Sequence, residues 1–135
     1  MFPSHDRKVF QNLEPSVGAL YRADRGGDLT FSCSVTAIDR HEGKTVALTA
    51  LHCVKQKNIS YRVTYDGSIF YNAQVWKLPP DKPKRGEPEV DMALLLVDGG
   101  DIPLVPIGVT DQPMAGQKIA MTGFPLGVSK INYWA

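Results

Sequence analysis

Runs of apolar and β-branched residues, separated by short polar turns, dominate residues 17–97 of this 135-residue chain. The run 30–38 alternates, with Phe31, Cys33 and Val35 on one face and serine or threonine on the other, as in a half-buried strand. The runs 45–50 and 91–97 are almost continuously apolar, which is typical of strands buried on both faces. Six strands are therefore predicted, at 17–21, 30–38, 45–50, 60–65, 68–78 and 91–97.

Turn residues separate these runs. Gly26-Gly27 and Gly43 close the first two connections, and Asp66-Gly67 between two strand-like runs predicts a hairpin. No segment of helical periodicity lies among the six runs, and their spacing is that of an all-β sandwich or barrel. The proline-rich stretch 79–88 cannot be a central strand, so we expect it to be an excursion from the sheet.

The segments on either side of the six runs differ from them in pattern. Residues 1–16 are polar, contain two prolines and show no clear periodicity, so we expect an N-terminal arm. Residues 98–106, with two glycines and two prolines, are expected to form a linker. After it, 117–124 and 131–134 are predicted as two further strands.

Composition and charge narrow the possible functions. Hydrophobic residues make up 43% of the chain and charged residues 21%, as in a domain with a packed core. The net charge is +1, and the basic cluster Lys82-Pro83-Lys84-Arg85 lies among prolines, so we expect a solvated loop and no nucleic-acid partner. No apolar run approaches the ~20 residues of a membrane helix, and no signal peptide is visible.

Two residues stand out as candidates for chemistry. His52 follows the buried run 45–50, where a rigid scaffold can hold an imidazole at a cleft as a general base, although a surface histidine beside a buried cysteine fits too. Asp91 begins an otherwise apolar strand, so its carboxylate either points into water or hydrogen-bonds a partner such as His52. His5 in the arm and His41 in a turn are poorer candidates for this pairing.

Several segments together resemble the trypsin/chymotrypsin-like serine proteases. Thr49-Ala50-Leu51-His52-Cys53 is similar to their Thr-Ala-Ala-His-Cys signature, and the segment 91–95 is similar to their Asp-Ile-Ala-Leu-Leu segment. Later segments resemble the bacterial branch, which includes periplasmic quality-control proteases. These are the linker 102–108, the Gly-x-x-Val-like segment 116–119, and the turn Gly123-Phe124-Pro125-Leu126-Gly127. The resemblance runs from about 17 to 133.

The resemblance implies a fold, a site and a partner. The fold would be an antiparallel six-stranded chymotrypsin-like barrel at 17–97, a linker at 98–106 and an incomplete second barrel at 107–135. His52 would be the catalytic base, Asp91 its orienting acid, and a peptide or protein the substrate, with no cofactor. Cys33 and Cys53 would form a disulfide, which would fit a secreted or periplasmic protein, whereas composition alone also allows two reduced thiols. No Cys-x-x-Cys or paired-histidine spacing suggests a metal site.

The nucleophile of that family is missing from this sequence. No Gly-x-Ser-Gly motif occurs, and Ser129 lacks the following glycine and comes too early, so we expect a turn residue there. Two hypotheses remain: part of a serine endopeptidase whose serine lies on absent sequence or a second chain, or a non-catalytic binding or structural module. Because the sequence stops inside a predicted strand, we favour the first. We expect the chain alone to be inactive, and to bind a complementary chain or self-associate through 117–135.

Overall fold

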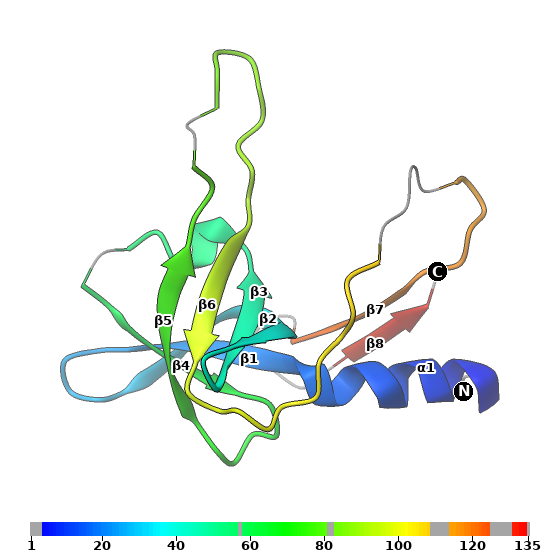
Figure 1. Ribbon diagram of the computed structural model, residues 1–135, viewed down its shortest axis with the longest axis horizontal. Coiled ribbons are helices and arrows are strands. Elements are labelled where there is room, and N and C mark those ends of the chain that lie inside the picture. The colour runs from blue at the N-terminus through cyan, green and yellow to red at the C-terminus, as the bar shows by residue number, and fades with distance from the viewer. Residues whose placement is uncertain (1–3, 57, 81–82, 109–113, 125–130, 135) are drawn as a thin grey trace.

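The computed structural model describes residues 4–56, 58–80, 83–108, 114–124 and 131–134, with the side chains of 4–6 and 131–134 left out. Most of the regular elements are strands (Figure 1). In chain order they are α1 (Ser4–Leu13), the 3₁₀ turn η1 (Glu14–Ser16), β1 (Val17–Ala23), β2 (Leu29–His41), β3 (Lys44–Thr49), the 3₁₀ turn η2 (Leu51–Cys53), β4 (Ser60–Thr64), β5 (Tyr71–Lys77), β6 (Ala93–Val97), β7 (Ala120–Gly123) and β8 (Ile131–Trp134).

Strands β1 to β6 form a closed barrel in the order β1-β2-β3-β6-β5-β4, and every neighbouring pair is antiparallel. The predicted all-β, six-stranded antiparallel barrel is therefore confirmed. The pairing of β3 with β6 and of β1 with β4 joins segments that are far apart in the chain, and it closes the sheet so that these six strands have no open edge.

The inward-facing side chains fill the barrel. Each of the six strands contributes apolar residues to one cluster, and the members least exposed to solvent are Leu20, Val35, Ala37, Ala47, Val63, Leu95 and Val97. Along β2 the predicted alternation holds from Ser34 to Ala37, where Val35 and Ala37 are buried and Ser34 and Thr36 are half-buried, whereas residues 31–33 are all half-buried. A packed interior of this kind provides a rigid support for the residues at the ends of its strands.

The β4–β5 connection differs from the short Asp-Gly hairpin that the sequence suggests. β4 ends at Thr64 and β5 begins only at Tyr71, so the loop spans 65–70. The Asp66 carboxylate accepts hydrogen bonds from the backbone N–H groups of Ser68 (2.8 Å) and Ile69 (2.9 Å). These side-chain bonds occupy N–H groups that would otherwise continue the strand, so β5 begins three residues later than expected.

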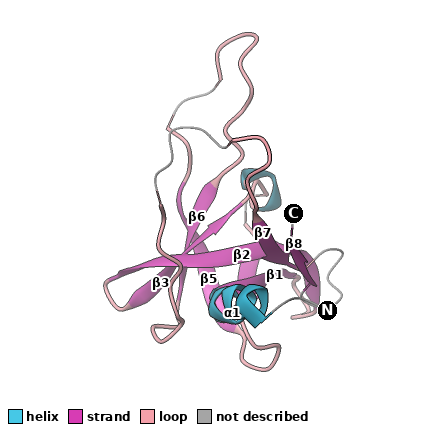
Figure 2. Cartoon of the chain, turned by 90° about the vertical axis from the view of Figure 1, so that its right-hand side faces the viewer, coloured by secondary structure: helices cyan, strands magenta, loops and turns pink. Residues whose placement is uncertain are grey.

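The expected N-terminal arm contains a helix that the sequence analysis missed. α1 runs from Ser4 to Leu13, and Phe10 on it is only 3% exposed. The helix packs against β7 (Figures 1 and 2). Its apolar residues are too few to show a clear period, so tertiary contact rather than local pattern accounts for it. In the described part of the chain no helix is long and apolar enough to cross a membrane.

Strands β7 and β8 pair with each other in a separate two-stranded sheet. The segment before them follows the barrel surface, where the Val105 N–H donates to the Ala37 carbonyl (2.9 Å) and Ile102 is buried. At the end of β7, the Phe124 N–H donates to Ser34 Oγ on β2 (2.8 Å). β7 is shorter than the predicted strand 117–124, and Pro125 to Lys130, with Ser129, lies outside the described residues.

Candidate active site

The pairing of β3 with β6 brings His52 and Asp91 together. Thr49, the last residue of β3, is opposite Ala93, the first residue of β6. His52 lies three residues beyond Thr49 in η2, and Asp91 lies two residues before Ala93, so both are at the same end of the barrel. Asp91 had been expected to begin the strand, but its carboxylate binds His52 and the ladder starts only at Ala93.

The Asp91 carboxylate makes two hydrogen bonds to the same histidine. Oδ1 accepts from the His52 backbone N–H at 2.8 Å, and Oδ2 lies 2.6 Å from His52 Nδ1. Because an ionised carboxylate only accepts, Nδ1 carries a proton in this arrangement, and in the neutral ring the lone pair is on Nε2. The ring is thus held in one tautomer and one orientation, which a general base needs.

The pair is open to solvent. The side chains of His52 and Asp91 are 67% and 51% exposed, so the Asp91 carboxylate both faces water and hydrogen-bonds His52. The backbone N–H of His52, followed by its side chain, lowers the pKa of Asp91 below the ordinary value of 3.8. Asp91 is therefore ionised near neutral pH and stays an acceptor for the histidine.

A disulfide holds the turn that carries His52. Cys33 on β2 and Cys53 in η2 are bonded, with their Cα atoms 6.3 Å apart. A ring nitrogen of His52 lies within 4.8 Å of both sulfur atoms, which superficially resembles a metal cluster. Sulfur atoms that are bonded to each other have no thiolate to offer a metal, so this group of side chains is not a metal site.

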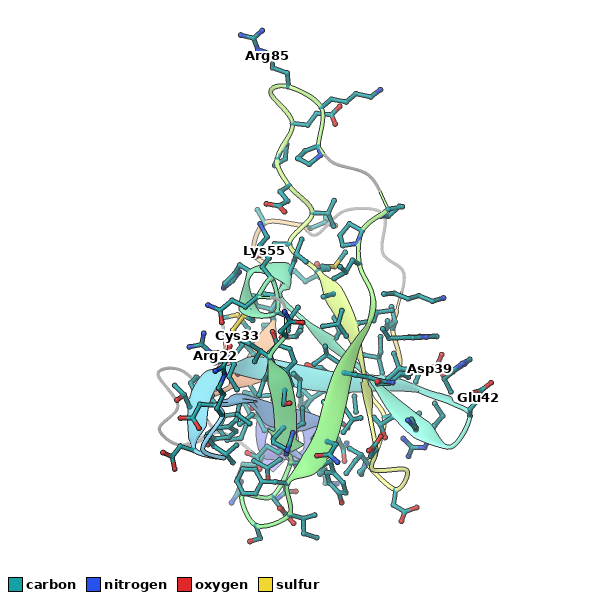
Figure 3. The ribbon with its side chains drawn as sticks, turned by 90° about the vertical axis from the view of Figure 1, so that its left-hand side faces the viewer. Arg22, Cys33, Asp39, Glu42, Lys55 and Arg85 are labelled. Carbon is teal, nitrogen blue, oxygen red and sulfur yellow. A yellow bond between two sulfur atoms is a disulfide. The ribbon has the colours of Figure 1, made fainter. Side chains whose placement is uncertain are left out.

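An ion pair beside the site was not foreseen from the sequence. Lys55 Nζ lies 2.9 Å from Glu89 Oε1, so it links the residues after η2 to the segment between the proline-rich excursion and Asp91. Figure 3 shows Lys55 near the base of that excursion and Arg85 at its far tip. No local signal marks the pair, because the two charges are 34 residues apart and only the fold brings them together.

The other residues considered from the sequence lie elsewhere. His41 is at the end of β2, where its ring stacks on Trp76 with centroids 4.7 Å apart. Its neighbours Asp39 and Glu42 lie across the barrel from Cys33 (Figure 3). His5 is in α1, and its side chain is not among those that the structure describes. Lys84 and Arg85 of the basic cluster are exposed in the excursion, as expected for a solvated loop.

Arg22 is a site residue that sequence reasoning overlooked. It lines a hollow of about 270 Å³ together with His52, Gln56 and the two bonded cysteines. In the sequence Arg22 precedes a Gly-Gly turn and resembles an ordinary strand-end cation. Only the pairing of β1 with β2 and β4 places it beside the histidine.

Comparison with known proteins identifies the fold. A scan against protein-family models and a search of curated proteins found no match. Among solved structures, a form of the HtrA-type protease AlgW with a tripeptide matches at TM-score 0.70 and 19% identity. AlgW with a decapeptide matches at TM-score 0.73 and 17% identity. Each alignment covers 95% of this chain but only 38% and 43% of those chains.

These matches confirm the predicted resemblance at the level of the fold. The chain has a barrel of the same fold as the one in these HtrA-type proteases, and it spans about two-fifths of the length of their chains.

Proposed function

We propose that this chain is the N-terminal portion of a trypsin-like serine endopeptidase. Residues 17–97 form its first barrel, 98–106 the linker and 107–135 the start of a second barrel. The chain supplies the histidine and aspartate of a Ser-His-Asp triad. Because no Gly-x-Ser-Gly motif occurs in the sequence, the serine comes from a polypeptide segment outside these 135 residues or from a second chain.

The geometry of His52 and Asp91 carries this proposal. Asp91 binds both the backbone N–H and Nδ1 of His52, which leaves Nε2 as the proton acceptor of an exposed imidazole. Nε2 takes the proton of an attacking serine hydroxyl and later gives it to the leaving amine, while Asp91 stabilises the imidazolium formed in between. The HtrA-type neighbours with bound tripeptide and decapeptide support a peptide as the substrate.

An activity-based probe tests the proposal. The tagged chain is isolated from its own cells under native conditions and treated with a fluorophosphonate, which labels activated serines. We expect label on a serine-bearing polypeptide in the eluate, and a rate of labelling that falls steeply with His52→Gln and Asp91→Asn. Loss of a triad member costs on the order of 10⁴-fold in rate. His41→Gln, on the far side of the barrel, is the matched control.

The outcome separates the two hypotheses for this chain. Equal labelling with wild type and with His52→Gln, or no labelled serine in the eluate, would remove the protease assignment. The barrel would then be a non-catalytic binding or structural module.

A further inference from the structure

Arg22 lies between two adjoining hollows of the barrel surface. The first, of about 270 Å³, contains His52, Gln56 and the Cys33–Cys53 disulfide. The second, of about 450 Å³, adds Arg25, Thr30 and Ser60. Because Arg22 lines both, the two hollows adjoin at Arg22, with the Cys33–Cys53 disulfide and His52 in the first and Arg25 in the second.

The Arg22 guanidinium is held in place but is not neutralised. Its residue pairs with Thr30 of β2 and Tyr61 of β4, so its backbone is fixed within the barrel. Nη1 donates to Gln56 Oε1 at 3.0 Å, and Nε is buried without a hydrogen-bond acceptor among the described residues. No carboxylate in the described part of the chain forms an ion pair with Arg22. Because the buried Nε is closed to a ligand, the donors that a ligand can reach are the Nη N–H groups that Gln56 does not occupy.

The chemistry of Arg22 favours a carboxylate as the ligand. A guanidinium presents a planar set of N–H donors that matches the two oxygens of a carboxylate, and each bond is charge-assisted. Arg25 adds positive charge further along. The Asp24 carboxylate also lines the second hollow, where its charge offsets that of Arg25, so the attraction of an acidic side chain rests on Arg22.

We propose that Arg22, oriented by Gln56, binds the side-chain carboxylate of an aspartate or glutamate in the peptide substrate. Because Arg22 and His52 line one hollow, this acidic residue lies within one or two positions of the bond that is cleaved. The inference rests on the proposed function, which it extends by naming a substrate preference.

Peptide binding to the 135-residue chain tests the preference without needing a nucleophile. The probes are acetyl-Ala-Glu-Ala-amide and its neutral isostere acetyl-Ala-Gln-Ala-amide, titrated at low salt and followed by NMR at the Arg22 Nε–H and His52 amide signals. We expect the glutamate peptide to bind about three- to tenfold more tightly, in the range of exposed and half-buried ion pairs. Arg22→Gln should abolish that difference, and Arg85→Gln, which removes the same charge at the distant tip of the excursion, should leave it intact.

Three results would overturn the inference. They are equal affinity of the wild type for the two peptides, loss of the affinity difference in Arg85→Gln as well as in Arg22→Gln, and no shift of the Arg22 Nε–H signal on binding. If Arg22→Gln fails to fold, the NMR titration of the wild-type protein is the test. The glutamate peptide must then shift Arg22 Nε–H more than the glutamine peptide does, and added salt must reduce the difference. Failure here with fluorophosphonate labelling intact would refute only the preference. Absence of labelling with an intact preference would refute only the protease assignment.

Discussion

At the scale of single residues, one carboxylate organises the candidate site. Asp91 binds the backbone N–H and the ring of His52 at once, so it fixes both where the turn lies and how the imidazole points. Both contacts need the ionised carboxylate, since a protonated acid accepts more weakly. The order of the site therefore depends on the ionisation of Asp91.

The first prediction concerns the pH at which this order is lost. The His52 backbone N–H and side chain lower the pKa of Asp91 below 3.8 in the folded chain. The stabilisation that the ionised Asp91 gives through His52 is therefore complete above the ordinary aspartate pKa, and it is lost as the pH falls through the lowered pKa of Asp91. The His52 amide proton, followed by NMR against pH, should shift with a midpoint below 3.8. Asp91→Asn should remove that transition, and a midpoint at or above 3.8 in the wild type would contradict the assignment.

The second prediction concerns Gly18, where β1 passes close to the end of β4. A Cβ at this position would lie 2.8 Å from the Thr64 carbonyl oxygen and 2.9 Å from the Tyr65 ring. Gly18→Ala should therefore lower the free energy of unfolding by about 1–3 kcal/mol, the usual cost of overpacking, as measured by urea denaturation.

Gly26→Ala is the matched control, because the nearest atom to its Cβ would be Asp24 Oδ1 at 3.5 Å. Its effect should stay within about 0.5 kcal/mol. Equal effects of the two substitutions would show that Gly18 is not a close contact.

At the scale of elements, the short turn η2 depends on its neighbours. It has three residues, and it is held to β2 by the disulfide and to the start of β6 by Asp91. Ser32 Oγ also lies 3.4 Å from the Cys53 carbonyl as a weak donor. A turn this short cannot hold a histidine in place alone, so its covalent link to β2 matters for the site as well as for stability.

The third prediction follows from that link. The bridged cysteines are 20 residues apart, and closing a loop of this length contributes about 3 kcal/mol to stability in the chain-entropy model. The double variant Cys33→Ala/Cys53→Ala should lose about that much in urea denaturation. It should also broaden the His52 amide signal, because η2 then loses its covalent link to β2. A loss under about 1 kcal/mol would show that the barrel fixes the turn without the bridge.

At the scale of the whole molecule, the two sheets differ in how they are completed. The barrel closes on itself, whereas β7 and β8 pair only with each other among the described strands. Isolated two-stranded sheets are marginally stable in water, and their open edges can pair with another chain. On and beside β7, the side chains of Ile119 and Met121 are 49% and 51% exposed.

The fourth prediction is that this sheet mediates association. With no complementary chain present, we expect the purified protein to self-associate through 117–135 as its concentration rises, as measured by size-exclusion chromatography with light scattering. Ile119→Lys/Met121→Lys should shift it towards monomer. Ile69→Lys, at a residue 53% exposed in the β4–β5 loop, should not.

Hydrogen exchange provides the opposing test for this sheet. A monomer across a hundredfold concentration range, with β7 amides as protected as those of the barrel, would show that the sheet needs no partner. The same monomer should show no peptidase activity, because a base and its orienting acid contribute little without a nucleophile and an oxyanion hole.

The sequence by itself determined the strands and the candidate pair. Alternation in 30–38, the apolar runs 45–50 and 91–97 and the glycine turns are local signals, and they located all six barrel strands. His52 and Asp91 were recognisable because each polar residue borders a run that is otherwise apolar. Local pattern suffices there, because the period of a strand and the turn chemistry beside it depend on neighbouring residues alone.

Only the tertiary structure decided what these elements place together. The β3–β6 pairing, the Lys55–Glu89 ion pair and the position of Arg22 beside His52 join residues that are distant in sequence. The helix α1 forms over a polar segment because its few apolar side chains, Phe10 among them, find a surface to cover. These outcomes depend on how the barrel closes, a property of all six strands together, and no window of neighbouring residues contains that information.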